Sequence, residues 1–170
     1  LARIGDVGPR TTGTTVRISP DPKYFDSPKI NLGQLEHLLR SKAVLMPNVT
    51  VELDIEGQDK KVWCYQNGMS DYLSEMMVGQ PVAPIFVGEK YVAVENGFSV
   101  GEGATWALAW FEEGGGKQES YVNLIPTLDG GTHEAGLKSG VFEAVKAFSE
   151  HHAILPAKVK LAQEDVCGKM

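Results

Sequence analysis

The four residues Gly130-Gly131-Thr132-His133 form the segment whose types and spacing best suit chemistry. Glycines before a Thr-capped helix can hold an anion on free backbone N–H groups, as phosphate-binding loops do. The same residues also suit a tight strand-to-helix connection, with glycines at positive φ and Thr132 as the N-cap. The segment lacks the Lys of a P-loop and the third Gly of a dinucleotide fingerprint. Local chemistry therefore favours the structural interpretation, and an anion site or a catalytic His133 is the alternative.

Other candidate catalytic groups stand alone in the sequence. Asp71 and Glu75 lie one helical turn apart, a spacing more typical of a solvated helix face than of an acid–base pair. Cys64 and Cys167 share no metal-ligand spacing, and no Ser/His/Asp or Cys/His arrangement has a supporting context. From the residues alone we expect no catalytic residue and no metal site in this chain.

The composition is that of an average globular protein. The chain has 170 residues, 42% of them apolar and 22% charged, which allows one core and a second small lobe. A formal net charge of -6 gives no basic face typical of a free-standing nucleic-acid binder. There is no run of 18 apolar residues and no signal-peptide pattern, and the first residue is Leu1. We therefore expect a cytoplasmic fragment that has no membrane span.

The elements that would position these groups follow from periodicity and from turn residues. The clearest is a helix that begins after Asn31 as N-cap, keeps leucines at helical spacing and stops before Pro47. A second helix begins at Thr132 and keeps apolar residues on one face, with Gly136 and Gly140 one turn apart for close approach of a neighbour. The other expected elements are strands at 14–18 and 92–94, two strands at 50–55 and 61–65 joined across 56–59, and a helix at 69–78. A hairpin of 105–111 with 119–126 across glycines 114–116 and a last strand at 159–161 complete them. This order predicts an α+β domain with a mostly antiparallel sheet.

Several unusual strings resemble one family, the B subunits of bacterial type IIA topoisomerases. The strings are Thr12-Gly13-Thr14-Thr15-Val16-Arg17, Phe25-Asp26-Ser27-Pro28, Leu39-Arg40-Ser41-Lys42-Ala43-Val44-Leu45, Glu119-Ser120-Tyr121-Val122-Asn123-Leu124-Ile125-Pro126-Thr127, Gly130-Gly131-Thr132-His133 and Ile154-Leu155-Pro156. The Gly-Gly-Thr-His segment after an Ile-Pro strand is the most specific of them. The resemblance runs from about Gly13 to Val166. Within the family, the segment 63–68 and the segment 119–123 look more like topoisomerase IV than gyrase, which is the alternative.

The resemblance implies a fold and a division into domains. Residues 1–20 would be the last strand region of an upstream ATP-binding domain and its junction, and residues 21–170 would be the transducer domain. The implied transducer is a four-stranded, mostly antiparallel sheet backed by helices, with a left-handed β-α-β crossover that departs from the usual right-handed rule. This crossover is an implication of the family and does not follow from periodicity.

The resemblance also implies where nucleotide chemistry takes place. ATP and Mg²⁺ would bind the upstream domain of the parent protein, so we expect no cofactor on this fragment by itself. Two positions match the family's adenine pocket: the hydroxyl of Thr14 would bind the adenine edge, and Val16 would line the pocket. The family's γ-phosphate-sensing lysine is not assigned to Lys169, because the Gln-Thr context of that lysine is missing.

The implied function is mechanical coupling. ATP binding would dimerise two B subunits, and the transducer would convert nucleotide state into gate closure and passage of DNA, which decatenates and relaxes DNA. The implied partners are the topoisomerase IV A subunit, a second B subunit and duplex DNA. Two other functions stay open: a nucleic-acid-binding module of the same fold, which the acidic balance disfavours, and a small enzyme that uses His133.

Overall fold

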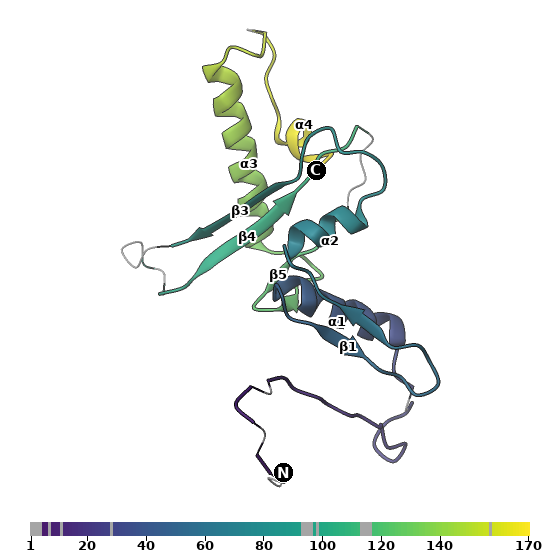
Figure 1. The fold of residues 1–170 in the computed structure, drawn as a ribbon. Coiled ribbons are helices and arrows are strands. Elements are labelled where there is room, and N and C mark those ends of the chain that lie inside the picture. The colour runs from purple at the N-terminus through teal and green to yellow at the C-terminus, as the bar shows by residue number, and fades with distance from the viewer. Residues whose placement is uncertain are drawn as a thin grey trace. The chain divides into compact units, whose positions relative to one another are not determined.

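The computed structural model describes residues 5–6, 8–10, 12–27, 29–92, 97, 99–112, 117–156 and 158–170. The chain divides into two compact units, Leu1–Leu35 and Glu36–Met170. Figure 1 shows the ribbon and labels most of its helices and strands.

The described residues of the first unit contain no strand, so the strand predicted at 14–18 is wrong for this chain. Val16 and Ile18 are 72% and 71% exposed. A strand needs a neighbour for its backbone N–H and C=O groups, and the described part of this unit supplies none. A short turn follows, in which the Asp21 carbonyl accepts a hydrogen bond from the Tyr24 N–H at 3.0 Å.

Helix α1 (Leu32–Leu45) begins where the sequence predicts. The side-chain oxygen of Asn31 accepts a hydrogen bond from the Gln34 N–H at 3.2 Å, which satisfies one free donor of the first turn. The helix ends two residues before Pro47, which cannot continue it.

The last turns of α1 contribute to a small core in the second unit. Strands β1 (Val51–Leu53) and β2 (Lys61–Trp63) pair antiparallel, as predicted, although they are shorter than expected. Helix α2 (Met69–Met76) follows. The core consists of Ala43, Val44, Tyr65 and Tyr72, with Val51, Trp63, Met69 and Met76 packed against it.

The next two hairpins differ from the predicted pairing. Strand β3 (Phe86–Tyr91) pairs antiparallel with β4 (Gly103–Leu108), and β5 (Tyr121–Val122) pairs with β6 (Ile125–Pro126). The predicted hairpin of 105–111 with 119–126 is therefore wrong, because β4 pairs with the upstream β3, and β5 pairs with β6 across a two-residue turn. The glycines at 114–116 and residues 93 and 94 of the strand predicted at 92–94 lie outside the described residues.

Helix α3 (Thr132–His151) confirms the long helix predicted from Thr132. In place of the strand predicted at 159–161, the chain runs without a strand into the short helix α4 (Gln163–Cys167). The indole N–H of Trp110, two residues after β4, donates to the Val166 carbonyl at 2.7 Å. This hydrogen bond holds α4 beside the end of β4. Helices α3 and α4 and the β3–β4 hairpin lie together in Figure 1.

The fold is α+β, as predicted. Among the described residues the strands form three separate two-stranded antiparallel sheets, so the expected four-stranded sheet and its left-handed crossover are not present in these pairings. The physical reason is that β1–β2, β3–β4 and β5–β6 are local hairpins, and no described strand joins one hairpin to another.

Candidate functional site

The connection between β6 and α3 carries the glycine segment. Gly130 has φ 70°, the left-handed conformation that suits glycine. A Cβ on Gly131 would lie 2.7 Å from the Cε1 atom of His133, so the His133 side chain would have to shift to admit one. The N-cap of α3 is Gly131 rather than the predicted Thr132, and no side chain caps the helix. The predicted positive φ is present at Gly130. The predictions of a positive φ at Gly131, whose φ of 171° is extended, and of Thr132 as the cap are wrong.

An anion is disfavoured at this turn by Glu134. A Cβ built on Gly130 would lie 3.0 Å from a Glu134 carboxylate oxygen, so a negative charge already occupies the start of α3. Glu134 accepts hydrogen bonds from the Ser120 hydroxyl and the Gln118 amide. The imidazole Nε2 of His133 lies 3.4 Å from the Thr127 hydroxyl. His133 therefore packs locally, beside groups that are already hydrogen-bonded to one another.

A second group of hydrogen-bonded polar side chains surrounds Glu119, two residues before β5. The Tyr72 hydroxyl donates to both carboxylate oxygens of Glu119 at 3.1 Å, and the Tyr121 hydroxyl donates to Glu119 at 2.6 Å. Burial, together with the Glu119 charge and hydrogen bond, raises the pKa of Tyr72 to about 12. Burial and the bond to Glu119 also raise the pKa of Tyr121. Both phenols therefore stay protonated donors at neutral pH.

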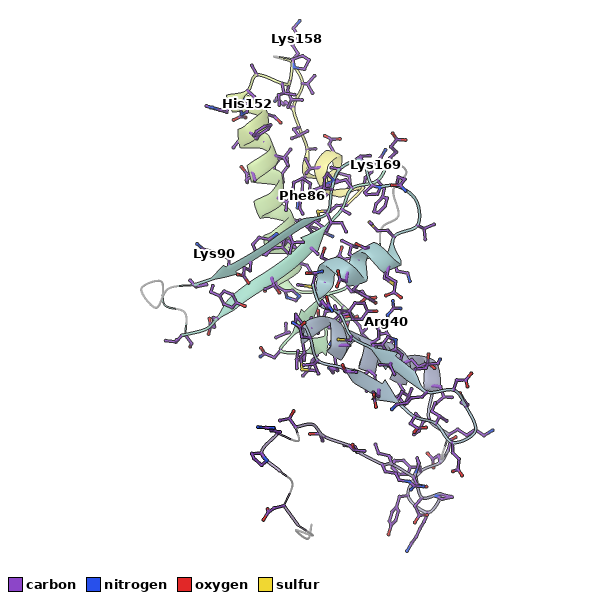
Figure 2. The ribbon with its side chains drawn as sticks, in the orientation of Figure 1. Arg40, Phe86, Lys90, His152, Lys158 and Lys169 are labelled. Carbon is purple, nitrogen blue, oxygen red and sulfur yellow. The ribbon has the colours of Figure 1, made fainter. Side chains whose placement is uncertain are left out.

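A third group of hydrogen-bonded side chains joins α1 to α2 through Arg40. Its Nε donates to the Tyr65 hydroxyl at 2.8 Å, the Tyr65 hydroxyl donates to Glu75 at 2.7 Å, and the guanidinium lies 2.6 Å from Glu75. The hydrogen bond from Tyr65, followed by the charge and hydrogen bond of Arg40, lowers the pKa of Glu75. The guanidinium also lies 4.9 Å from the ring centre of Tyr72. Arg40 is labelled in Figure 2.

The candidate carboxylates thus have structural partners. Asp71, expected on a solvated face, accepts hydrogen bonds from the Asn67 backbone and side chain at 2.8 and 3.0 Å. Glu75 belongs to the ion pair with Arg40. Among the described residues no group of three His, Cys, Asp or Glu side chains could hold a metal ion. Nor does any described helix have the length and apolar character needed to cross a membrane.

An apolar groove of about 740 Å³ opens between α3 and the β3–β4 hairpin. It is lined by Val82, Ala83, Phe86, Trp106, Leu108, Trp110, Gly136, Leu137, Gly140, Val141, Ala144, Val145 and Phe148. Phe86 packs edge-on against Trp110 at 5.5 Å between ring centres, and is labelled in Figure 2. Apart from the backbone of α3, no described atom lies within 4 Å of a Cβ built on Gly136 or Gly140. The close approach predicted for these glycines is therefore absent among the described residues. The apolar face of α3 is therefore only partly covered.

Thr14 and Val16, the predicted adenine-site residues, lie in the first unit. Both are exposed, on a segment without strand pairing. Their proposed role stays a prediction.

The family follows from the match of these elements. A family model described as DNA gyrase B matches residues 68–170, which contain α2, β3 to β6, α3 and α4. The chain belongs to the DNA gyrase B family. Two curated relatives, the B subunits of DNA topoisomerase 4 from Salmonella typhimurium and Haemophilus influenzae, are 44% and 45% identical over 98% of the chain. The chain spans about a quarter of their length, 26% of each.

Two solved structures of family members share the fold. The topoisomerase IV ATP binding domain of Francisella tularensis, in complex with a small-molecule inhibitor, has a TM-score of 0.58 and 28% identity, and the match covers 86% of this chain and 38% of that one. The 43K ATPase domain of Thermus thermophilus gyrase B, in complex with an aminocoumarin, has a TM-score of 0.65 over 84% of this chain and 38% of that one. At 20% identity, the gyrase match shows similarity of fold alone.

Sequence reasoning missed the two tyrosine groups. Tyr65 and Tyr72 fall within a predicted strand and a predicted helix, but the partners of their hydroxyls do not follow from those elements. One signal is present: a buried tyrosine needs a hydrogen-bond partner for its hydroxyl. The identity of the partner depends on tertiary structure, because Glu119 is 47 residues away from Tyr72.

Proposed function

We propose that this chain is the transducer part of a topoisomerase IV B subunit, which couples ATP use in a preceding domain to gate closure and DNA strand passage. One observation carries the proposal: relatives that bear the name of that protein match 98% of the chain at 44% identity. The match to an ATP-binding-domain structure over 86% of the chain supports a place in the ATPase region.

The proposed mechanism is conformational. ATP bound upstream would bring two B subunits together, and loss of the γ-phosphate would release them, as in nucleotide switches generally. The transducer would move as a body during this cycle. Its paired polar groups favour such a role, because hydrogen-bonded and packed contacts resist continuous deformation.

The apolar groove supports a larger sheet in the whole protein. We propose that further residues of the parent cover the exposed face of α3 and complete the four-stranded sheet with its left-handed crossover. The relatives are about four times longer than this chain, so they contain enough residues for this. An apolar opening of about 740 Å³ is unfavourable in water and favours such a cover.

Thr14 and Val16 would contribute to the adenine site from the edge of the upstream domain. Their exposure in this chain is compatible with this role, because both side chains are free to pack against a neighbouring domain. ATP with Mg²⁺ would bind mainly to upstream groups. In the parent, we propose the topoisomerase IV A subunit, a second B subunit and duplex DNA as partners, in the cytoplasm.

Calorimetric titration with a non-hydrolysable ATP analogue and Mg²⁺ tests this assignment. One sample is this chain, and the other is a longer chain that includes the upstream domain. We expect binding by the longer chain and none by residues 1–170. Tight binding by residues 1–170 would mean that a complete nucleotide site lies here, and would overturn the proposal.

The same region of DNA gyrase B is the second candidate, because the matching family model carries that description. The full-length protein, reconstituted with its partner, distinguishes the two. ATP-dependent introduction of negative supercoils would assign the chain to gyrase. Decatenation and relaxation without supercoiling would assign it to topoisomerase IV.

A further inference from the structure

The β5–β6 hairpin lies between two groups of packed elements. On one side is the core of α1, β1–β2 and α2, built on Ala43, Val44, Tyr65 and Tyr72. On the other side is α3, whose apolar face lines the groove with the β3–β4 hairpin. In Figure 1 the hairpin lies beside α1 and α2, near the start of α3. Hydrogen bonds of Glu119 and Ser120, directly before β5, join it to both neighbours.

The contact with α2 runs through one carboxylate. Tyr72 is only 9% exposed, and its hydroxyl donates to both oxygens of Glu119. The Tyr72 ring is held edge-on against Tyr65 at 5.9 Å between ring centres. The position of α2 therefore fixes the position of the Tyr72 hydroxyl, which donates the hydrogen bonds that Glu119 accepts. A second contact comes from α1, where the Lys42 ammonium donates to the Leu124 carbonyl at the hairpin turn.

The contact with α3 is made by the carboxylate of Glu134. Ser120 follows Glu119 directly, and its hydroxyl donates to Glu134 in the first turn of α3. Gln118, on the other side of Glu119, donates its amide N–H to the same carboxylate. Three successive residues thus alternate between the two neighbours: Glu119 binds α2, and Gln118 and Ser120 bind α3. Successive side chains of an extended segment point to opposite faces, which explains the alternation.

We propose that Glu119 and Glu134 are positioning residues, which make the β5–β6 hairpin a polar joint that transmits movement of the α1–α2 side to α3. This inference rests on the proposed function, since it assigns the residues through which the transducer would couple ATP use to strand passage. Hydrogen bonds to charged groups suit a joint because they are directional and stronger than neutral ones. Loss of the Tyr72 bond leaves Glu119 with only the Tyr121 donor of its own hairpin, so the link to α2 is lost although the apolar core is kept.

The test uses the full-length B subunit assembled with its A subunit. Tyr72→Phe removes only the hydroxyl that crosses to Glu119, and Glu119→Gln removes the charge that receives it. Tyr121→Phe is the matched control, since it removes a phenol that also donates to Glu119 but lies on the hairpin itself. The rate of ATP hydrolysis and the rate of DNA decatenation are measured for each, and their ratio reports coupling.

We expect Tyr72→Phe and Glu119→Gln to lower decatenation per ATP about fivefold or more, the lower end of typical couplings between sites. ATP hydrolysis should continue in both variants, and Tyr121→Phe should keep the wild-type ratio. The double variant that combines Tyr72→Phe with Glu119→Gln should have a ratio no lower than that of the worse single variant. An unchanged ratio in Tyr72→Phe would overturn the inference. So would an equal fall of hydrolysis and decatenation, or an equal effect of Tyr121→Phe. A wild-type assembly without ATP-dependent decatenation would instead overturn the proposed function.

Discussion

Leu124 has a backbone conformation that is costly for a side chain with a Cβ. Its φ is 70° and that of Asn123 is 48°, the pair of positive angles that closes a two-residue hairpin turn. Leu124 is 37% exposed, and Lys42 contacts its carbonyl rather than its side chain. We expect Leu124→Gly to be more stable than Leu124→Ala by about 1 kcal/mol, because both lose the branched end of the leucine and only glycine also loses the Cβ that causes the left-handed strain. Urea unfolding of the two variants measures this, and equal midpoints would contradict it.

Glu75 gives the stability of the fold a pH dependence. Tyr65 and Arg40 hold the pKa of Glu75 below its ordinary value of 4.5 in the folded state. Its contribution is therefore fully present above pH 4.5 and is lost as the pH falls through the lowered pKa. We expect the unfolding midpoint of Glu75→Gln to fall less steeply than that of the wild type as the pH drops below 4.5. Parallel pH profiles for the two proteins would show that the ion pair makes no such contribution.

At the scale of elements, the start of α2 depends on one glycine. Gly68 has φ 54°, and a Cβ there would lie 3.1 Å from the Val44 carbonyl oxygen and 3.2 Å from the Pro47 side chain. Gly57 has φ 82° but no atom within 4 Å of such a Cβ. Gly57→Ala should therefore cost about 1 kcal/mol from the backbone alone. Gly68→Ala should cost more, by about 1 kcal/mol or above, because α2 must also move away from α1. Thermal unfolding compares the two, and equal losses would rule out a steric role for Gly68.

At the scale of the whole molecule, the groove along α3 is the feature that a longer protein would change. Phe148 lines it and is 57% exposed. In residues 1–170, Phe148→Ser should cost only about 1 kcal/mol, because more than half of the side chain is already in water. In the full-length protein, a covered Phe148 should cost about 3 kcal/mol or more when truncated. Denaturant unfolding of both lengths measures this, with Glu150→Ser on the same helix as the control. Equal, small losses at both lengths would mean that the groove stays open.

How far the sequence predicts the fold depends on the range of the interactions. The Asn31 cap, the stop before Pro47 and the run of α3 from Thr132 are all predicted correctly, since capping and periodicity act within a few residues. Strand pairing is predicted correctly for β1–β2 and wrongly for 105–111, where β4 pairs with the upstream β3. The sequence of a strand does not identify the strand with which it pairs. The upstream β3 and a downstream segment are therefore both candidate partners for β4.

The candidate site shows the same division. Composition, spacing and the family strings by themselves determined an α+β chain of the DNA gyrase B family with a glycine at positive φ, Gly130, before the long helix. Only the tertiary structure decided that Glu119 faces Tyr72 while its neighbour Ser120 faces Glu134. The physical reason is that a hydrogen bond between side chains 47 residues apart depends on the packing of whole elements, whereas caps and turns depend on adjacent residues.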